Sequence, residues 1–161
     1  MHEMLKERIR EGLIDASVPD TATFREAVEA LHDSTLSAIA VLTDDRRVAG
    51  LFGAKQLLHG LFPLYLEELT HSAFVPDDLP GLTEHVAEVS VESVTEFMVE
   101  PDVVDLDSSA THIAEKLLHS DIRALAVLEE DRYIGMIGAL KFCWLVYRSL
   151  APDSSAAPQP E

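Results

Sequence analysis

Seven histidines and several acidic side chains are the groups of this sequence that could hold a metal ion or move protons. His71 follows Glu67 by four residues, a spacing that could place both on one face of a helix. The His-Glu-x-x-His pattern of a zinc-binding helix does not occur. His32 and His119 end two predicted helices, where an imidazole interacts favourably with the terminal carbonyls. We therefore favour a structural role for the histidines over a metal site.

No nucleophile stands at the spacing of a known catalytic motif. Ser34, Ser37 and Thr43 have no evident base, and neither Gly-x-Ser-x-Gly nor Gly-x-x-x-x-Gly-Lys-Ser/Thr occurs. Cys143 is the only cysteine, which excludes a disulfide within the chain and a cysteine-based zinc site. Its apolar neighbours favour a buried small side chain over a reactive thiol. The sequence predicts that the protein is not an enzyme.

Composition and charge exclude several other classes of protein. The 161 residues carry 29 acidic and 12 basic side chains, a formal charge of -17, whereas a nucleic-acid surface needs an excess of Lys and Arg. No apolar run approaches the ~20 residues that cross a bilayer. The charged, amphipathic N-terminus does not read as a signal peptide. We expect a cytoplasmic protein with no nucleic-acid or membrane partner.

One pattern occurs twice, and it must position whatever site exists. Residues 36–55 and 122–140 each read as an apolar strand, an acidic turn, a second strand containing glycine and the start of a helix. The acids of the turns, at 44–45 and 129–131, are expected to be solvated. Helical runs at 21–32 and 109–119 precede the two stretches, and the offset between copies drifts only from 88 to 85. This is an internal repeat.

Each copy is predicted as strand–helix–strand–strand–helix, a small α/β (α+β) unit with helices on one face of its sheet. Asp20 or Thr21 is the predicted cap of the first repeat's helix, and Ser108 or Ser109 that of the second. The predicted organisation is an N-terminal helix (1–12), repeat 1 (13–60), a helical insertion or linker that is not duplicated (61–95), repeat 2 (96–150) and a disordered tail (151–161).

This ordered set resembles a tandem CBS-domain pair, named after the cystathionine β-synthase domain. In the second copy Met98 with Val103-Val104, Ala124-Leu125-Ala126-Val127 and Ile134-Gly135-Met136-Ile137 are similar to that family's lead-in, middle strand and last strand. In the first copy Ala38-Ile39-Ala40-Val41 and Val48-Ala49-Gly50-Leu51-Phe52 match. The resemblance covers roughly residues 10–150. It implies two CBS-type β-α-β-β-α repeats related by a pseudo-twofold axis.

The resemblance also implies ligand sites. Such pairs commonly bind adenosine-containing ligands in clefts between the repeats and dimerise through their helices. In the family a Thr or Ser after the last strand meets phosphate, and an Asp three residues later holds the ribose hydroxyls. Here Gly53 and Gln56 occupy these positions in repeat 1, and Gly138 and Lys141 in repeat 2. Losing two hydrogen bonds of ~1–3 kcal/mol each would weaken a micromolar nucleotide to roughly millimolar.

Two functions therefore stay open. One is a stand-alone regulatory or adaptor module, a homodimer that binds AMP, ADP, ATP or S-adenosylmethionine and regulates an unknown protein. The other is a dimerisation or protein-interaction scaffold without a ligand. Arg123 and Lys141 could offer charge to a phosphate, although a solvated Lys and an Arg paired with an acid are the simpler reading. The candidate ligand-binding residues are Ser37, Ala38, Ala40, Gly53, Gln56, Val103, Val104, Arg123, Ala124, Ala126, Gly138 and Lys141.

Overall fold

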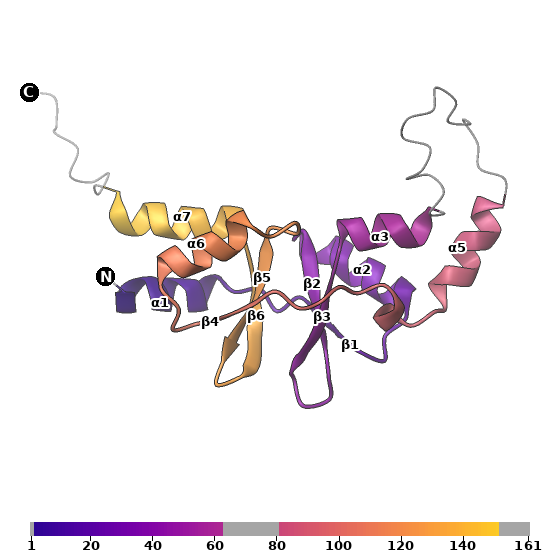
Figure 1. The fold of residues 1–161 in the computed structure, drawn as a ribbon, viewed down its shortest axis with the longest axis horizontal. Coiled ribbons are helices and arrows are strands. Elements are labelled where there is room, and N and C mark those ends of the chain that lie inside the picture. The colour runs from indigo at the N-terminus through magenta and orange to yellow at the C-terminus, as the bar shows by residue number, and fades with distance from the viewer. Residues whose placement is uncertain (1, 63–80, 152–161) are drawn as a thin grey trace, which may run out of the picture.

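The computed structural model describes residues 2–62 and 81–151, and these form two similar α/β units (Figure 1). Residues 63–80 of the predicted insertion and residues 152–161 of the predicted tail lie outside the described residues. The first half contains α1 (His2–Gly12), β1 (Ser17–Pro19), α2 (Phe24–Ser34), β2 (Ala38–Leu42), β3 (Val48–Gly53) and α3 (Ala54–Leu61). The second contains α5 (Leu82–Ser90), the 3-10 helix η2 (Val94–Glu96), β4 (Val103–Asp105), α6 (Ala110–Leu118), β5 (Ala124–Glu129), β6 (Arg132–Gly138) and α7 (Ala139–Leu150).

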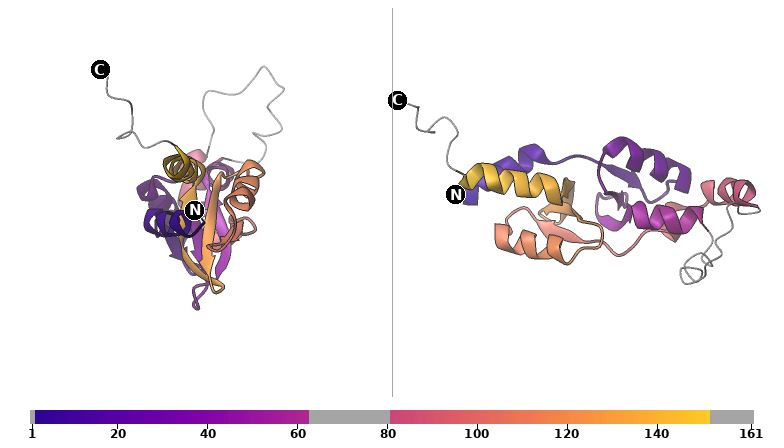
Figure 2. Two further views of the ribbon diagram at one scale, coloured as in Figure 1. Left: turned by 90° about the vertical axis from the view of Figure 1, so that its left-hand side faces the viewer. Right: turned by 90° about the horizontal axis from the view of Figure 1, so that it is seen from above.

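The two sheets have the same topology, which confirms the predicted fold class. Their orders are β1-β2-β3 and β4-β5-β6, with a parallel first pair and an antiparallel second pair. In each sheet the middle strand shifts register at an equivalent place, between Val41 and Leu42 and between Val127 and Leu128. The sheets stand side by side at the centre of the molecule, and the helices lie at its two ends (Figures 1 and 2).

Small side chains let the two sheets approach each other. Ala124 and Ala126 of β5 belong to the same buried cluster as the core of repeat 1, whereas Leu125 and Val127 pack with the helices of repeat 2. A strand directs alternate side chains to opposite faces, so β5 serves both cores at once. Tyr133 adds a polar link between the repeats, because its buried hydroxyl accepts from the Ala16 N–H at 3.2 Å. Burial raises the pKa of this hydroxyl.

Each repeat also lends a short segment to the sheet of the other. Ile14 exchanges two backbone hydrogen bonds with Met136 on the edge strand β6, and Val99 exchanges two with Leu51 on the edge strand β3. Both pairs are related by the same offset of 85 residues. A Cβ on Gly50 would lie 2.7 Å from the Val99 carbonyl oxygen, so that position requires glycine.

The helices that precede the repeats are exchanged in the same way. α1 packs on α7 of repeat 2, and α5 packs on α3 of repeat 1. The segment predicted to be unduplicated thus contains, in α5, a counterpart of α1. Leu5 and Ile9 of α1 are buried in the core of repeat 2.

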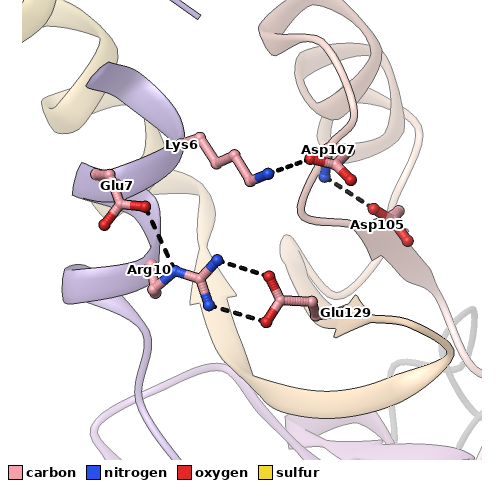
Figure 3. A network of polar contacts seen from close by, with 6 residues as sticks. All are labelled: Lys6, Glu7, Arg10, Asp105, Asp107 and Glu129. Atoms are coloured by element: carbon pink, nitrogen blue, oxygen red, sulfur yellow. Dashed lines mark hydrogen bonds and ion pairs between the residues drawn. The ribbon is translucent and has the colours of Figure 1, made fainter. Parts of the chain in front are cut away.

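Ion pairs hold α1 against the loops and hairpin of repeat 2 (Figure 3). Arg10 forms a two-pronged contact with Glu129, with N–O distances of 2.9 and 2.6 Å, and Lys6 pairs with Asp107. These hydrogen bonds hold the pKa of both Glu129 and Asp107 below the ordinary values. Among residues 2–62 and 81–151, no such ion pair is found for α5, and His85 instead contacts the Gly60 carbonyl oxygen at 2.8 Å.

The helix caps correct one detail of the repeat alignment. Ser109 caps α6 by accepting from the His112 N–H, as predicted. α2, however, begins at a capping box formed by Thr23 and Glu26, not at Asp20 or Thr21. The glutamate three residues after the threonine completes this box, and it is the signal that identifies the true start. Thr23 and Ser109 are therefore the equivalent positions of the two repeats.

Candidate functional site

Two clefts of similar size lie between the repeats, at the starts of the second helix of each repeat. The first, called the α7 cleft, has a volume of about 570 Å³. The second, called the α3 cleft, has a volume of about 510 Å³. The lining residues of the α7 cleft are Thr35, Leu36, Ser37, Arg123, Gly138, Ala139, Leu140, Lys141 and Trp144. Those of the α3 cleft are Lys55, Gln56, His59, Phe97, Val99, Glu100, Pro101, Asp102, His119, Ser120, Asp121 and Ile122.

The α7 cleft is built where β6 passes directly into α7. Gly138 is the N-cap of α7 and brings no side chain to the helix start. The neighbouring loop of repeat 1 closes the other side, and the Ser37 hydroxyl fastens it by donating to the Ile122 carbonyl at 2.7 Å. Leu36, Leu140 and Trp144 make the wall largely apolar. The result is a shallow, carbon-lined cleft that both repeats share.

Two cationic side chains and no acidic one line the α7 cleft. Neither the Arg123 guanidinium nor the Lys141 ammonium has a hydrogen-bond or ion-pair partner among the residues that the structure describes. The expected pairing of Arg123 with an acid is therefore not seen there. The backbone of Arg123 is left-handed (φ 59°), and its carbonyl accepts from Ala139 at 2.9 Å, which fixes it at the start of α7.

Lys141 also touches the N-terminal helix. A Cβ placed on Gly12, the last residue of α1, would lie only 3.1 Å from the Lys141 Cε. The carbon stem of Lys141 thus packs against the end of α1 while the residue lines the cleft.

In the α3 cleft, a side chain of α3 already binds the backbone at the start of the helix. The buried Gln56, 6% exposed, accepts from the Gly53 N–H at 2.9 Å through Oε1. A Cβ on Gly53 would lie 2.8 Å from the Ser37 carbonyl oxygen and 3.2 Å from this same Oε1. The corresponding Cβ on Gly138 would meet nothing closer than Leu36 Cδ2, at 3.7 Å. The helix start is therefore closed in the α3 cleft and open in the α7 cleft.

The charge of the α3 cleft is opposite to that of the α7 cleft. Lys55 is its one lysine or arginine, against the acids Glu100, Asp102 and Asp121, of which Asp102 also pairs with Lys116 at 3.9 Å. Glu100 and Asp102 lie on the segment that leads into repeat 2, and this segment does not line the α7 cleft. An anion is thus favoured in the α7 cleft and disfavoured in the α3 cleft.

The structure brings together only some of the residues that the sequence suggested. Arg123, Gly138, Lys141 and Ser37 meet in the α7 cleft, and Gln56 lines the α3 cleft beside Gly53. The other suggested residues line neither cleft. Val104 is buried in the core of repeat 2, and Val103 is half-buried. Four alanines are completely buried between the sheets: Ala38, Ala40, Ala124 and Ala126.

Sequence reasoning missed Leu36, Leu140 and Trp144, which form the apolar wall. The spacing of Leu140 and Trp144, four residues apart at the start of a helix, was the available signal. Leu140 is 86% and Trp144 52% exposed. Cys143 is also exposed, which contradicts the predicted burial of its thiol.

The described residues offer no alternative metal or membrane site. Within residues 2–62 and 81–151, no three His, Cys, Asp or Glu side chains come together in a way that could hold a metal ion. No helix in these same ranges is long and apolar enough to cross a membrane.

The comparisons identify the repeated unit. A family model described as "CBS domain" matches twice, at residues 12–62 and 91–140. Among curated proteins, no sequence matches the chain. The solved structure of a CBS domain-containing protein of unknown function from Kribbella flavida is similar with a TM-score of 0.66 and 24% identity, over 85% of this chain and 96% of that chain.

Two further solved structures share the fold at lower identity. The CBS-pair protein CBSX2 from Arabidopsis thaliana has a TM-score of 0.65 and 16% identity, over 88% of this chain and 94% of that chain. A CBS domain-containing protein of unknown function from Bacillus anthracis has a TM-score of 0.66 and 18% identity, over 91% and 94%. With both repeats matched by the family model, the chain belongs to the CBS-domain family as a tandem pair.

Proposed function

We propose that this CBS pair is a regulatory module that binds an anionic ligand in its α7 cleft. The observation that supports this most is the charge of that cleft. Arg123 and Lys141 line it without an acidic neighbour in a protein whose acids outnumber its bases by 29 to 12. Adenosine nucleotides are the ligand class that the family resemblance implies, and their phosphates fit this charge.

Binding would act on the angle between the repeats. A ligand that contacts both the loop around Leu36 and the start of α7 bridges the two halves. Because Lys141 packs against Gly12, the same ligand would also act on the docking of α1. Regulation requires that the ligand bind one arrangement more tightly than the other, since equal affinity shifts no population.

A thermal-shift panel of AMP, ADP, ATP, NAD and S-adenosylmethionine at millimolar concentration tests the proposal. We expect stabilisation that increases from AMP to ATP and is weakest for S-adenosylmethionine, whose sulfonium is cationic. Arg123→Gln should reduce the shift, whereas Lys55→Gln in the α3 cleft should leave it unchanged. Stabilisation that is the same in both variants would argue against the α7 cleft as the site.

A second candidate function, a homodimeric scaffold, is favoured by the outer face of α7. Leu140, Trp144, Tyr147 and Leu150 are all more than half exposed, and Trp144 and Tyr147 stack with ring centroids 6.1 Å apart. α7 contains no carboxylate, so a second copy could cover this face with little of the repulsion that a charge of -17 produces elsewhere.

Light scattering after size exclusion tests the scaffold. Tyr147→Glu should convert a dimer to a monomer, because Tyr147 lies on the exposed face but does not line the cleft. Leu58→Glu on α3 is the matched control, since Leu58 is exposed to a similar degree on the equivalent helix of repeat 1. A wild-type monomer, or a dimer that survives Tyr147→Glu, would contradict dimerisation through α7.

A further inference from the structure

We infer that the α7 cleft is specific for an amphiphilic anion, a small carboxylate with an aromatic or branched apolar body, and does not read a ribose. This inference rests on the proposed function, since it names the ligand class of the same cleft. Three features of the cleft support it: its wall, its hydrogen-bonding groups and its charges.

The wall of the cleft is carbon over most of its lining. Leu36 and Leu140 face it from the two repeats, and the half-exposed indole of Trp144 adds a flat aromatic surface. The indole has neighbours that restrain it, because it stacks on Tyr147 and the Arg148 guanidinium lies 5.7 Å from its centroid. A fixed aromatic plane beside two leucines favours a ligand body that is apolar or aromatic.

The cleft offers little to a sugar. Its two hydroxyl side chains already donate to backbone carbonyls, Ser37 to Ile122 and Thr35 to Ser34, at 2.7 and 2.6 Å. No carboxylate or side-chain amide lines it, and Lys141 stands where a family member would place the aspartate that holds the ribose. Lysine has donors only, so it cannot accept from ribose hydroxyls. A nucleotide would find no carboxylate acceptor for its ribose hydroxyls, and only the hydroxyl oxygens of Ser37 and Thr35 could still accept.

The two cationic side chains of the cleft match the anionic head of such a ligand. Arg123, just before β5, and Lys141 of α7 both line the cleft, and neither is neutralised by a neighbour among the described residues. A single carboxylate can be shared between a guanidinium and an ammonium, and such charge-assisted hydrogen bonds are the strong ones. At about 570 Å³ the cleft is within the size range of small-molecule sites. One anionic head on an apolar body thus uses every feature of the lining.

The only tryptophan of the chain lines this cleft, so its fluorescence reports occupancy directly. The probes are 3-phenylpropanoate and 4-methylpentanoate, with 3-phenylpropanol and 3-phenylpropylamine as neutral and cationic controls of the same shape. We expect saturable changes in Trp144 emission with the carboxylates alone. Arg123→Gln or Lys141→Gln should each weaken binding about tenfold, and Lys55→Gln should not.

ATP, measured by calorimetry on the same samples, separates this inference from the proposed function. Carboxylate binding that depends on Arg123 and Lys141 and exceeds ATP binding supports the inference. ATP binding without carboxylate binding overturns it and leaves the proposed function standing. If neither class binds, both fail. The inference is also overturned if 3-phenylpropanol binds as tightly as the carboxylates, or if neither substitution weakens carboxylate binding. In either case the cations would have no part in recognition.

Discussion

The α7 and α3 clefts have the same backbone plan and nearly equal volumes, yet they suit opposite charges. Counting from the N-cap glycines, Leu140 corresponds to Lys55, Lys141 to Gln56 and Trp144 to His59. These helix positions form an apolar wall with one cation in the α7 cleft and a polar wall in the α3 cleft. The comparison teaches that duplication kept the scaffold of both clefts, while the few side chains at each helix start decided which of them stays open to an anion.

The largest effect is expected from restoring the nucleotide-binding side chains in the open cleft. The double substitution Gly138→Thr and Lys141→Asp should raise ATP affinity by about tenfold, because two hydrogen bonds of ~1–3 kcal/mol each are gained while the contact of the Lys141 ammonium with phosphate, itself worth about tenfold, is lost. The space next to Gly138 admits the new side chain, whose nearest neighbour would be Leu36 at 3.7 Å. Calorimetry with ATP provides the measurement.

The matched double substitution in the other repeat, Gly53→Thr with Gln56→Asp, should gain no affinity. The Ser37 carbonyl oxygen, 2.8 Å from a Cβ on Gly53, blocks the threonine, and the acids of the α3 cleft repel the phosphates. Equal gains in both clefts would show that the difference between them is not functional.

The same difference should appear in stability without any ligand. Gly53→Ala is expected to cost about 1–3 kcal/mol, because a new methyl group must push backbone aside. Gly138→Ala should be close to neutral, since both glycines have negative φ and only the second has room. Urea denaturation of the two variants measures this. A stable Gly53→Ala protein would mean that the α3 cleft opens more easily than its geometry suggests.

Gln56 sharpens the comparison further. Gln56→Ala should destabilise the protein by about 1–2 kcal/mol, because the Gly53 N–H loses the amide oxygen that satisfies it. Lys141→Met at the equivalent position, which keeps the carbon stem that packs on Gly12, should leave stability nearly unchanged, since the ammonium that it removes has no partner among the described residues. Thermal denaturation of both variants under one buffer condition tests the difference. A similar loss in the two would contradict the structural role assigned to Gln56 alone.

The smallest effect concerns the helices that dock on the outside of the repeats. The folded pKa of Glu129 and Asp107 lies below the ordinary values of 4.5 and 3.8. Their contribution to stability is therefore complete above those values and is lost as the pH falls through the folded pKa. Amide hydrogen exchange should show α1 loosening under acid before α5, which no described ion pair holds.

Glu129→Gln provides the control for this acid effect. It removes the titrating group, so part of the pH dependence of α1 should disappear while the exchange of α5 stays the same. If α1 and α5 loosen together in the wild type, the ion pairs of Figure 3 do not govern the docking of α1.

Much of the fold could be predicted from the sequence because the chain repeats it. Each copy shows the same order of apolar runs, acidic turn and glycine-containing strand, and a pattern met twice is hard to produce by chance. The absent hydroxyl and aspartate at Gly53, Gln56, Gly138 and Lys141 were also visible. The consequences of these absences could not be predicted, because the sequence does not distinguish a glycine with open space beside it, Gly138, from one that lies against a carbonyl oxygen, Gly53.

The charge of each cleft could not be predicted for a related reason. The acids Glu100, Asp102 and Asp121 come from the lead-in of repeat 2 and from the loop before β5, and they line one cleft with α3 of repeat 1 only in the folded pair. The role of α5 was hidden as well, because α1 and α5 share a position in the fold without sharing a sequence pattern. Which sheet edge or cleft a segment reaches is a property of the folded pair and not of the segment.

The exchange of lead-in segments makes the two halves depend on each other. Ile14 covers the edge of β6, and Val99 covers the edge of β3. A half expressed alone would expose one unpaired strand and carry a loose peptide suited to another, which is the condition for aggregation or strand swapping. Two separately produced halves, once mixed, are expected to reassemble into a soluble split protein, each supplying the strand that the other lacks.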